Sequence, residues 1–181
     1  MNIPTLCIFS GLHGSGKSTL AKELAKITGS VYLRIDTVEQ AIRDLCNFKV
    51  EGEGYRLSYR IASDNLNIGN NVIADSCNPV EFTRSEWNEV ANNASAEYIN
   101  IEIICSDKHE HRWRVEARVT EVIGLDMPTW QEVENREYHP WRSNRIIIDT
   151  AKKSVEESVH ELLRSIHEHK NDSQTNARRV R

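Results

Sequence analysis

The chain has 181 residues, of which 39% are hydrophobic and 28% are charged, and its formal net charge is −4. This composition excludes collagen-like, low-complexity and wholly disordered chains, and the length fits one domain. No apolar run approaches the roughly 20 residues of a membrane-spanning helix, and the N-terminus lacks the segments of a secretory signal. We therefore expect a soluble, cytoplasmic protein that does not bind a membrane.

Charge is spread unevenly along the chain. Lys170 and three arginines against Asp172 give the last twelve residues a net +3, which leaves −7 for the rest. An acidic body argues against a broad duplex-binding face. Residues 170–181 are polar and have no apolar stripe, so we predict a single domain over 1–169 and a disordered basic tail.

The first half of the chain alternates between short apolar runs and amphipathic stretches. Residues 5–10 read as a buried strand, followed by a glycine-rich turn and a helix in which Leu20, Leu24 and Ile27 form one stripe up to Gly29. A strand over 31–35, a helix over 37–45, a helix over 55–66 and a strand over 71–75 follow.

The second half repeats the pattern. It predicts a helix carrying Trp87 and Val90, a strand over 98–105, a charged helix over 108–122, an irregular stretch over 124–140 with a short helix at 130–136, a strand over 145–149 and a final helix from Val155 to Ile166. Strands that alternate with helices imply an α/β fold with a parallel sheet covered on both faces.

Residues Gly11 to Ser18 match the phosphate-binding pattern G-x-x-x-x-G-K-[ST] at every fixed position, between a strand and a helix. Glycines let backbone N–H groups approach phosphates, the lysine neutralises the β- and γ-phosphates, and the serine hydroxyl is a Mg²⁺ ligand. The expected nucleotide-binding residues are Gly11, His13, Gly14, Ser15, Gly16, Lys17, Ser18 and Thr19.

Three of the predicted strands end in aspartate, and ligands of parallel sheets bind at the carboxyl ends of strands. Asp75 would hold a Mg²⁺-bound water beside the loop or, alternatively, cap the next turn. Asp36 would be either a helix N-cap or the base that accepts the proton of an attacking hydroxyl. Ser76, where many motor ATPases have glutamate, favours transfer to an acceptor over hydrolysis.

Arg114 and Arg118 are four residues apart in the charged helix, where like charges repel unless an anion or nearby carboxylates compensate. A polyphosphate would compensate. The alternative is a solvated helix face with Glu110 and Glu116 as partners.

Taken together, these residues resemble the P-loop kinases of small molecules and polynucleotide ends, the group of polynucleotide kinase, zeta toxins, chloramphenicol phosphotransferase and gluconate kinase. The resemblance covers about 6–166. It rests on the glycine-rich loop, on Ile35-Asp36 with Arg43, on Val72 to Ser76 with Asn78 and Arg84, and on Arg112-Trp113-Arg114 with Arg118.

This resemblance implies a P-loop three-layer sandwich with a five-stranded parallel sheet in order 2-3-1-4-5 and a small lid at about 112–140. It implies Asp36 as base, Arg114 and Arg118 in a lid over ATP, and an adenine side near Asp149 and Thr150. Acceptor contacts would come from Arg43, Asp75, Asn78 and Arg84, and metal contacts from Ser18 and Asp75.

One departure bears on the acceptor, because no arginine stands three residues after Asp36, where polynucleotide kinases grip a terminal phosphate. The sequence therefore predicts an ATP- and Mg²⁺-dependent kinase acting on a small-molecule hydroxyl. The alternatives are a nucleotide-dependent switch or ATPase with a protein partner and a polynucleotide 5′-hydroxyl kinase. The sequence leaves the oligomeric state open.

Overall fold

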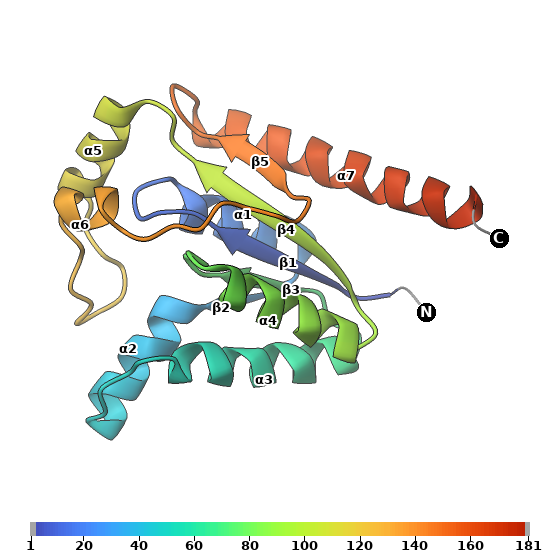
Figure 1. Ribbon diagram of the computed structural model, residues 1–181, viewed down its shortest axis with the longest axis horizontal. Helices are drawn as coiled ribbons and strands as arrows, with labels where there is room; N and C mark the ends of the chain where they lie inside the picture. Colours follow the sequence, from blue (N-terminus) through green and yellow to red (C-terminus); the bar gives the residue numbers. More distant parts are fainter. Residues whose placement is uncertain (1–2, 180–181) are drawn as a thin grey trace.

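The computed structural model describes residues 3–179, and its centre is one sheet of five parallel strands (Figure 1). The strands are β1 (Thr5–Ser10), β2 (Val31–Arg34), β3 (Val72–Asp75), β4 (Glu97–Ile104) and β5 (Ile146–Asp149), in the order β2-β3-β1-β4-β5. β1 is buried along its whole length and pairs with β3 and β4. The predicted fold class and strand order are confirmed.

Helices cover both faces of the sheet. They are α1 (Lys17–Thr28), α2 (Ile35–Cys46), α3 (Glu53–Asn67), α4 (Glu81–Asn93), α5 (Lys108–Ala117), α6 (Trp130–Glu134) and α7 (Val155–Arg179). α1 and α7 cover one face of the sheet, α3 and α4 cover the other, and α5 and α6 gather beyond the carboxyl ends of the strands (Figure 1).

The alternation of side chains along the strands builds one apolar core on each face. Cys7 and Phe9 of β1 pack into the core under α1 and α7, whereas Leu6 and Ile8 pack into the core under α3 and α4, with Trp87. The sheet is thus fixed from both sides, and loops at its carboxyl edge rest on a rigid base.

The charged helix ends earlier than its spacing predicts. α5 stops at Ala117, and Arg118 has extended backbone angles (φ −71°, ψ 133°). Of the supposed stripe only Val115 and Val122 are buried, while Val119 is 85% exposed. Without burial of that stripe nothing holds the last predicted turn in helical form.

The tail prediction is also corrected, because α7 continues through Arg179 in place of a disordered segment from residue 170. No glycine or proline interrupts the sequence after Val155, so a helix started on the core can propagate. Lys170 Nζ donates to Thr5 Oγ1 at 3.0 Å and ties this part to β1. Residues 180–181 lie outside the described part of the chain. Between residues 3 and 179, no helix combines the length and apolar character needed to cross a bilayer.

Candidate active site

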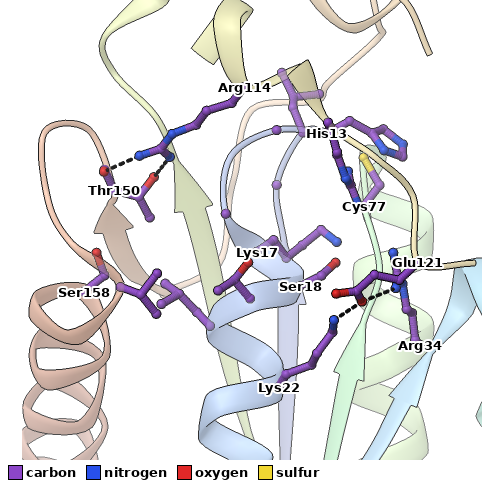
Figure 2. Close-up of a pocket in the computed structure, with 18 of the residues that line it drawn as sticks. His13, Lys17, Ser18, Lys22, Arg34, Cys77, Arg114, Glu121, Thr150 and Ser158 are labelled. Carbon is purple, nitrogen blue, oxygen red and sulfur yellow. Dashed lines mark hydrogen bonds and ion pairs between the residues drawn. The ribbon is translucent and has the colours of Figure 1, made fainter. Parts of the chain in front are cut away.

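A cavity of about 410 Å³ opens at the carboxyl ends of β1 and β2, where parallel sheets bind their ligands. The glycine-rich loop and the start of α1 form its floor, and α5 with the residues after it closes one side (Figure 2). Its walls include Arg34, Asp36, Cys77, Arg114, Arg118, Glu121, Thr150 and Ser158.

The loop has no room for side chains at two of its glycines. A Cβ on Gly11 would lie 2.2 Å from the carbonyl oxygen of Ile103, and one on Gly14 (φ +81°) would lie 2.5 Å from Val115 Cγ2. The loop therefore lies directly against β4 at Gly11 and directly against α5 at Gly14. The backbone therefore follows a tight path, in which the N–H groups of Gly11 and Ser15 donate to the carbonyl oxygens of Cys77 and Leu12.

Lys17 forms a buried ion pair with Asp75. Its Nζ lies 2.6 Å from Asp75 Oδ1, and the Tyr32 hydroxyl donates to Asp75 Oδ2 at 2.6 Å. Burial alone would raise the pKa of Asp75, but the Lys17 ammonium and the hydrogen bonds from Lys17, Tyr32 and Ser18 outweigh it and lower the pKa. Asp75 sits behind Lys17 and does not itself line the cavity.

His13 and His111 connect the loop to α5. His111 Nε2 lies 2.7 Å from the carbonyl oxygen of His13, so it is the donor, and its ring meets Trp130 edge to face. Burial lowers the pKa of His13 to about 4, against the opposing effect of the Asp36 carboxylate. His13 is therefore neutral near pH 7 and adds no charge to the cavity.

Asp36 lines the cavity from the first turn of α2. The helix begins after Arg34, which takes the N-cap position, so the reading of Asp36 as an N-cap is wrong. The Asp36 side chain is 25% exposed, and Arg34 Nη2 lies 3.9 Å from its Oδ2. A cavity-facing carboxylate with only this loose ion pair is free to meet a ligand.

Arg114 reaches across the cavity to the loop after β5 (Figure 2). It donates to Thr150 Oγ1 at 2.7 Å, to the Thr150 carbonyl at 3.0 Å and to Glu110 Oε1 at 2.6 Å. Because Glu110 already compensates its charge and Arg118 lies beyond the end of α5, the expected repulsion along one helix face is absent. Both arginines nevertheless line the cavity.

Besides Asp75, five predicted ligand-binding residues do not line the cavity, namely Ser15, Arg43, Asn78, Arg84 and Asp149. Arg84 is 1% exposed and donates to backbone carbonyls of Asn78, Pro79 and His139, with the Trp141 ring 4.1 Å away. The amide of Asn78 donates to the Phe9 carbonyl. These two side chains hold the chain after β3 in place and do not reach the cavity.

Arg43 and Asp149 are likewise engaged outside the cavity. Arg43 is paired with Glu39 on α2, at 3.3 Å. Asp149 accepts hydrogen bonds from the backbone N–H groups of Ser106 and Ala151, which fixes the loop after β5. Of the two residues predicted to lie near the adenine, only Thr150 lines the cavity.

The sequence reasoning missed four charged residues that line the cavity, namely Lys22, Arg34, Glu121 and Lys153. Glu121 pairs with Lys22 and, at 3.6 Å, with Arg34 (Figure 2). Arg34 could have been found, because it stands two residues before Asp36 at the end of the same predicted strand. Glu121 could not be found, because its segment reads as helix and is not.

A glycine-rich loop between β1 and α1, a parallel sheet in this order and a cavity at its carboxyl edge define a P-loop NTPase fold of the kinase-like kind. The chain belongs to the AAA domain family, whose sequence model matches residues 6–136. No curated protein matches the chain significantly.

Solved structures similar to this chain share its fold at low sequence identity. A gluconokinase from Sinorhizobium meliloti 1021 has a TM-score of 0.70 and 16% identity, covering 97% of this chain and 99% of its own. The Mycobacterium tuberculosis APS kinase CysC in complex with AMPPNP and APS has a TM-score of 0.66 and 17% identity, covering 92% and 99%. Chaetomium thermophilum Kti12 in complex with ADP-AlF3 has a TM-score of 0.64 and 19% identity, covering 90% and 97%.

Proposed function

We propose that the protein is a kinase that transfers the γ-phosphoryl group of ATP to a hydroxyl group of a small molecule. One observation carries the proposal: the phosphate-loop residues Lys17 and Ser18 and the carboxylate of Asp36 line the same cavity. Phosphoryl transfer needs a phosphate cradle and a carboxylate that orients the acceptor hydroxyl. Two of the similar structures are a gluconokinase and an APS kinase, which supports this class of reaction.

The phosphate side is formed by the loop and α1. Its backbone N–H groups and the N-terminus of α1 attract the phosphates, and Lys17 exchanges Asp75 for the β- and γ-phosphates when nucleotide binds. Arg114, held by Thr150 and Glu110, stands beside this path as a fixed positive charge. Charge stabilisation of this kind supplies most of the catalysis in phosphoryl transfer.

The residues present fit a magnesium ion that depends on the nucleotide. Ser18 offers a hydroxyl and Asp75 a carboxylate kept ionised by its surroundings, which are the oxygen donors that Mg²⁺ prefers. In the described part of the chain, no cluster of three or more His, Cys, Asp and Glu side chains could hold a metal by itself. When bound, the ion would neutralise charge on the phosphates.

Asp36 serves the acceptor side. The acceptor oxygen attacks the γ-phosphorus, its proton passes to the Asp36 carboxylate, and the bond between the γ-phosphorus and the bridging oxygen breaks, which leaves ADP. General-base assistance of this type is worth about 10²- to 10⁴-fold in rate. His13, which is neutral near pH 7, faces the same region without competing for that proton.

The test is ADP formation by the purified protein with Mg-ATP, measured alone and with pools of sugars, hydroxy acids, nucleosides and aminoglycosides. A kinase forms ADP faster with one pool, and mass spectrometry finds a product heavier by one phosphoryl group. Acceptor-independent ADP formation with no phosphorylated product would instead support the switch alternative.

A further inference from the structure

Arg34 is a buried cation whose hydrogen-bonding capacity is unused. Its side chain is 7% exposed, although it carries five N–H donors. Nε is buried and finds no hydrogen-bond partner in the described part of the chain. Its two ion pairs, at 3.9 Å to Asp36 and 3.6 Å to Glu121, are longer than hydrogen bonds. Such a group is costly unless a ligand completes its contacts.

The position of Arg34 in the sheet brings it close to the phosphate machinery. Arg34 of β2 is the register partner of Asp75 of β3, and neighbouring strands lie about 4.8 Å apart. Tyr32, two residues earlier and therefore on the same face, donates its hydroxyl to Asp75. Arg34 thus projects on the α1 face of the sheet, beside the carboxylate that holds Lys17.

Glu121 occupies the cavity next to this guanidinium. Its carboxylate lies between Lys22 of α1 and Arg34, and all three residues line the cavity (Figure 2). Glu121 is itself 67% exposed and belongs to the non-helical segment after α5, so it can leave at little cost. An exposed carboxylate is a weak partner for a buried arginine, whereas a phosphate group can accept two hydrogen bonds from it.

We propose that Arg34 is a further phosphate-binding residue, one that contacts the terminal phosphate of a bound nucleoside triphosphate, and that Glu121 is its placeholder before nucleotide binds. Binding of the triphosphate then replaces Glu121 at Arg34 and releases the segment that carries it. A diphosphate lacks the group that would reach Arg34 and leaves the Glu121 contact in place. This inference rests on the proposed nucleotide site.

The experiment compares the affinities of the full chain for AMP-PNP and ADP, with Mg²⁺, by titration calorimetry. Arg34→Gln should lower affinity for AMP-PNP by about tenfold or more, the usual scale of a hydrogen bond to a charged group, with ADP affinity unchanged. Glu121→Gln removes the competing carboxylate and should raise affinity for AMP-PNP alone. The matched control is Glu116→Gln, which breaks an ion pair of α5 with Arg112 outside the cavity and should change neither affinity.

The two variants make the inference separable from the proposed function. If the wild-type chain binds neither nucleotide, the nucleotide site itself is refuted. If it binds both, but Arg34→Gln shifts the two affinities equally or not at all, Arg34 does not contact the terminal phosphate. If Arg34→Gln fails to fold, Glu121→Gln decides, because unchanged preference for AMP-PNP in that variant overturns the placeholder role.

Discussion

Replacing Lys17 by methionine tests whether its buried ion pair with Asp75 stabilises the fold. In Lys17→Met, the Asp75 carboxylate, 1% exposed, loses the ammonium that lies 2.6 Å away. Removing one partner of a buried pair costs about 3–5 kcal/mol. The Tyr32 hydroxyl still donates to the other oxygen at 2.6 Å, so we expect a loss of about 3 kcal/mol in the free energy of unfolding.

The loss should depend on pH in a defined direction. In the wild type the pKa of Asp75 is lowered, so the ionised carboxylate contributes stability above its ordinary pKa of 3.8, and this contribution is lost as pH falls through the folded value. Without Lys17, burial raises the pKa of Asp75, which favours the protonated form in the folded state. The difference between wild type and variant is therefore largest near pH 7 and shrinks as pH falls toward 4.

Urea denaturation at several pH values measures this difference. The double variant Lys17→Met/Asp75→Asn leaves no unpaired charge and should recover much of the loss, giving a coupling energy of about 1–3 kcal/mol. Lys26→Met, which breaks an exposed pair with Glu23 on the same helix, should cost less than about 0.5 kcal/mol. A single variant at Lys17 that is as stable as the Lys26 control at every pH would refute the buried pair.

Three other variants address the site. Asp36→Asn should lower acceptor-dependent turnover by about 10²- to 10⁴-fold in a coupled ADP assay while nucleotide affinity stays constant, and unchanged turnover would remove Asp36 as base. Arg114→Ala loses three hydrogen bonds and should lower the free energy of unfolding by about 1–3 kcal/mol. The control Arg118→Ala should lower it by less than about 0.5 kcal/mol. Equal losses for the two variants in thermal denaturation would contradict the contacts at Thr150. Gly14→Ala should weaken nucleotide binding about tenfold or more, because its Cβ would lie 2.5 Å from Val115 Cγ2. The double variant Gly14→Ala/Val115→Ala should recover part of the affinity. No recovery would show that the clash with Val115 does not decide the position of the loop.

Sheet and loop could be predicted because local patterns dictate them. Five apolar runs too short for helices, each followed by a helical stripe, admit few arrangements other than a parallel sheet. The phosphate loop was located because its glycines, Lys17 and Ser18 have a fixed spacing. These features depend on neighbours in the chain, which a sequence displays directly.

The acceptor side could not be predicted in the same way. Arg84 and Asn78 occupy sequence positions that suggest ligand contact, but backbone carbonyls distant in the chain claim their donors. Arg34 reads as one residue of the predicted strand over 31–35, and only the structure shows that its charge is buried without hydrogen-bond partners for Nε. Tertiary contacts decide which hydrogen-bond donors are satisfied, and these contacts cannot be read from composition or residue spacing.

The central place of β1 in the sheet has a consequence for synthesis. β1 leaves the ribosome before both of its partner strands, because Leu6 pairs with Val72 and Tyr98, which emerge much later. A nascent chain that ends before β4 has a glycine-rich loop without the strand and the helix α5 that shape it. Such non-local pairing forms slowly, so nucleotide can stabilise only chains that have grown past α5. A bound nucleotide would then act on this protein as a late folding ligand, stabilising only those chains in which β4 and α5 have already emerged.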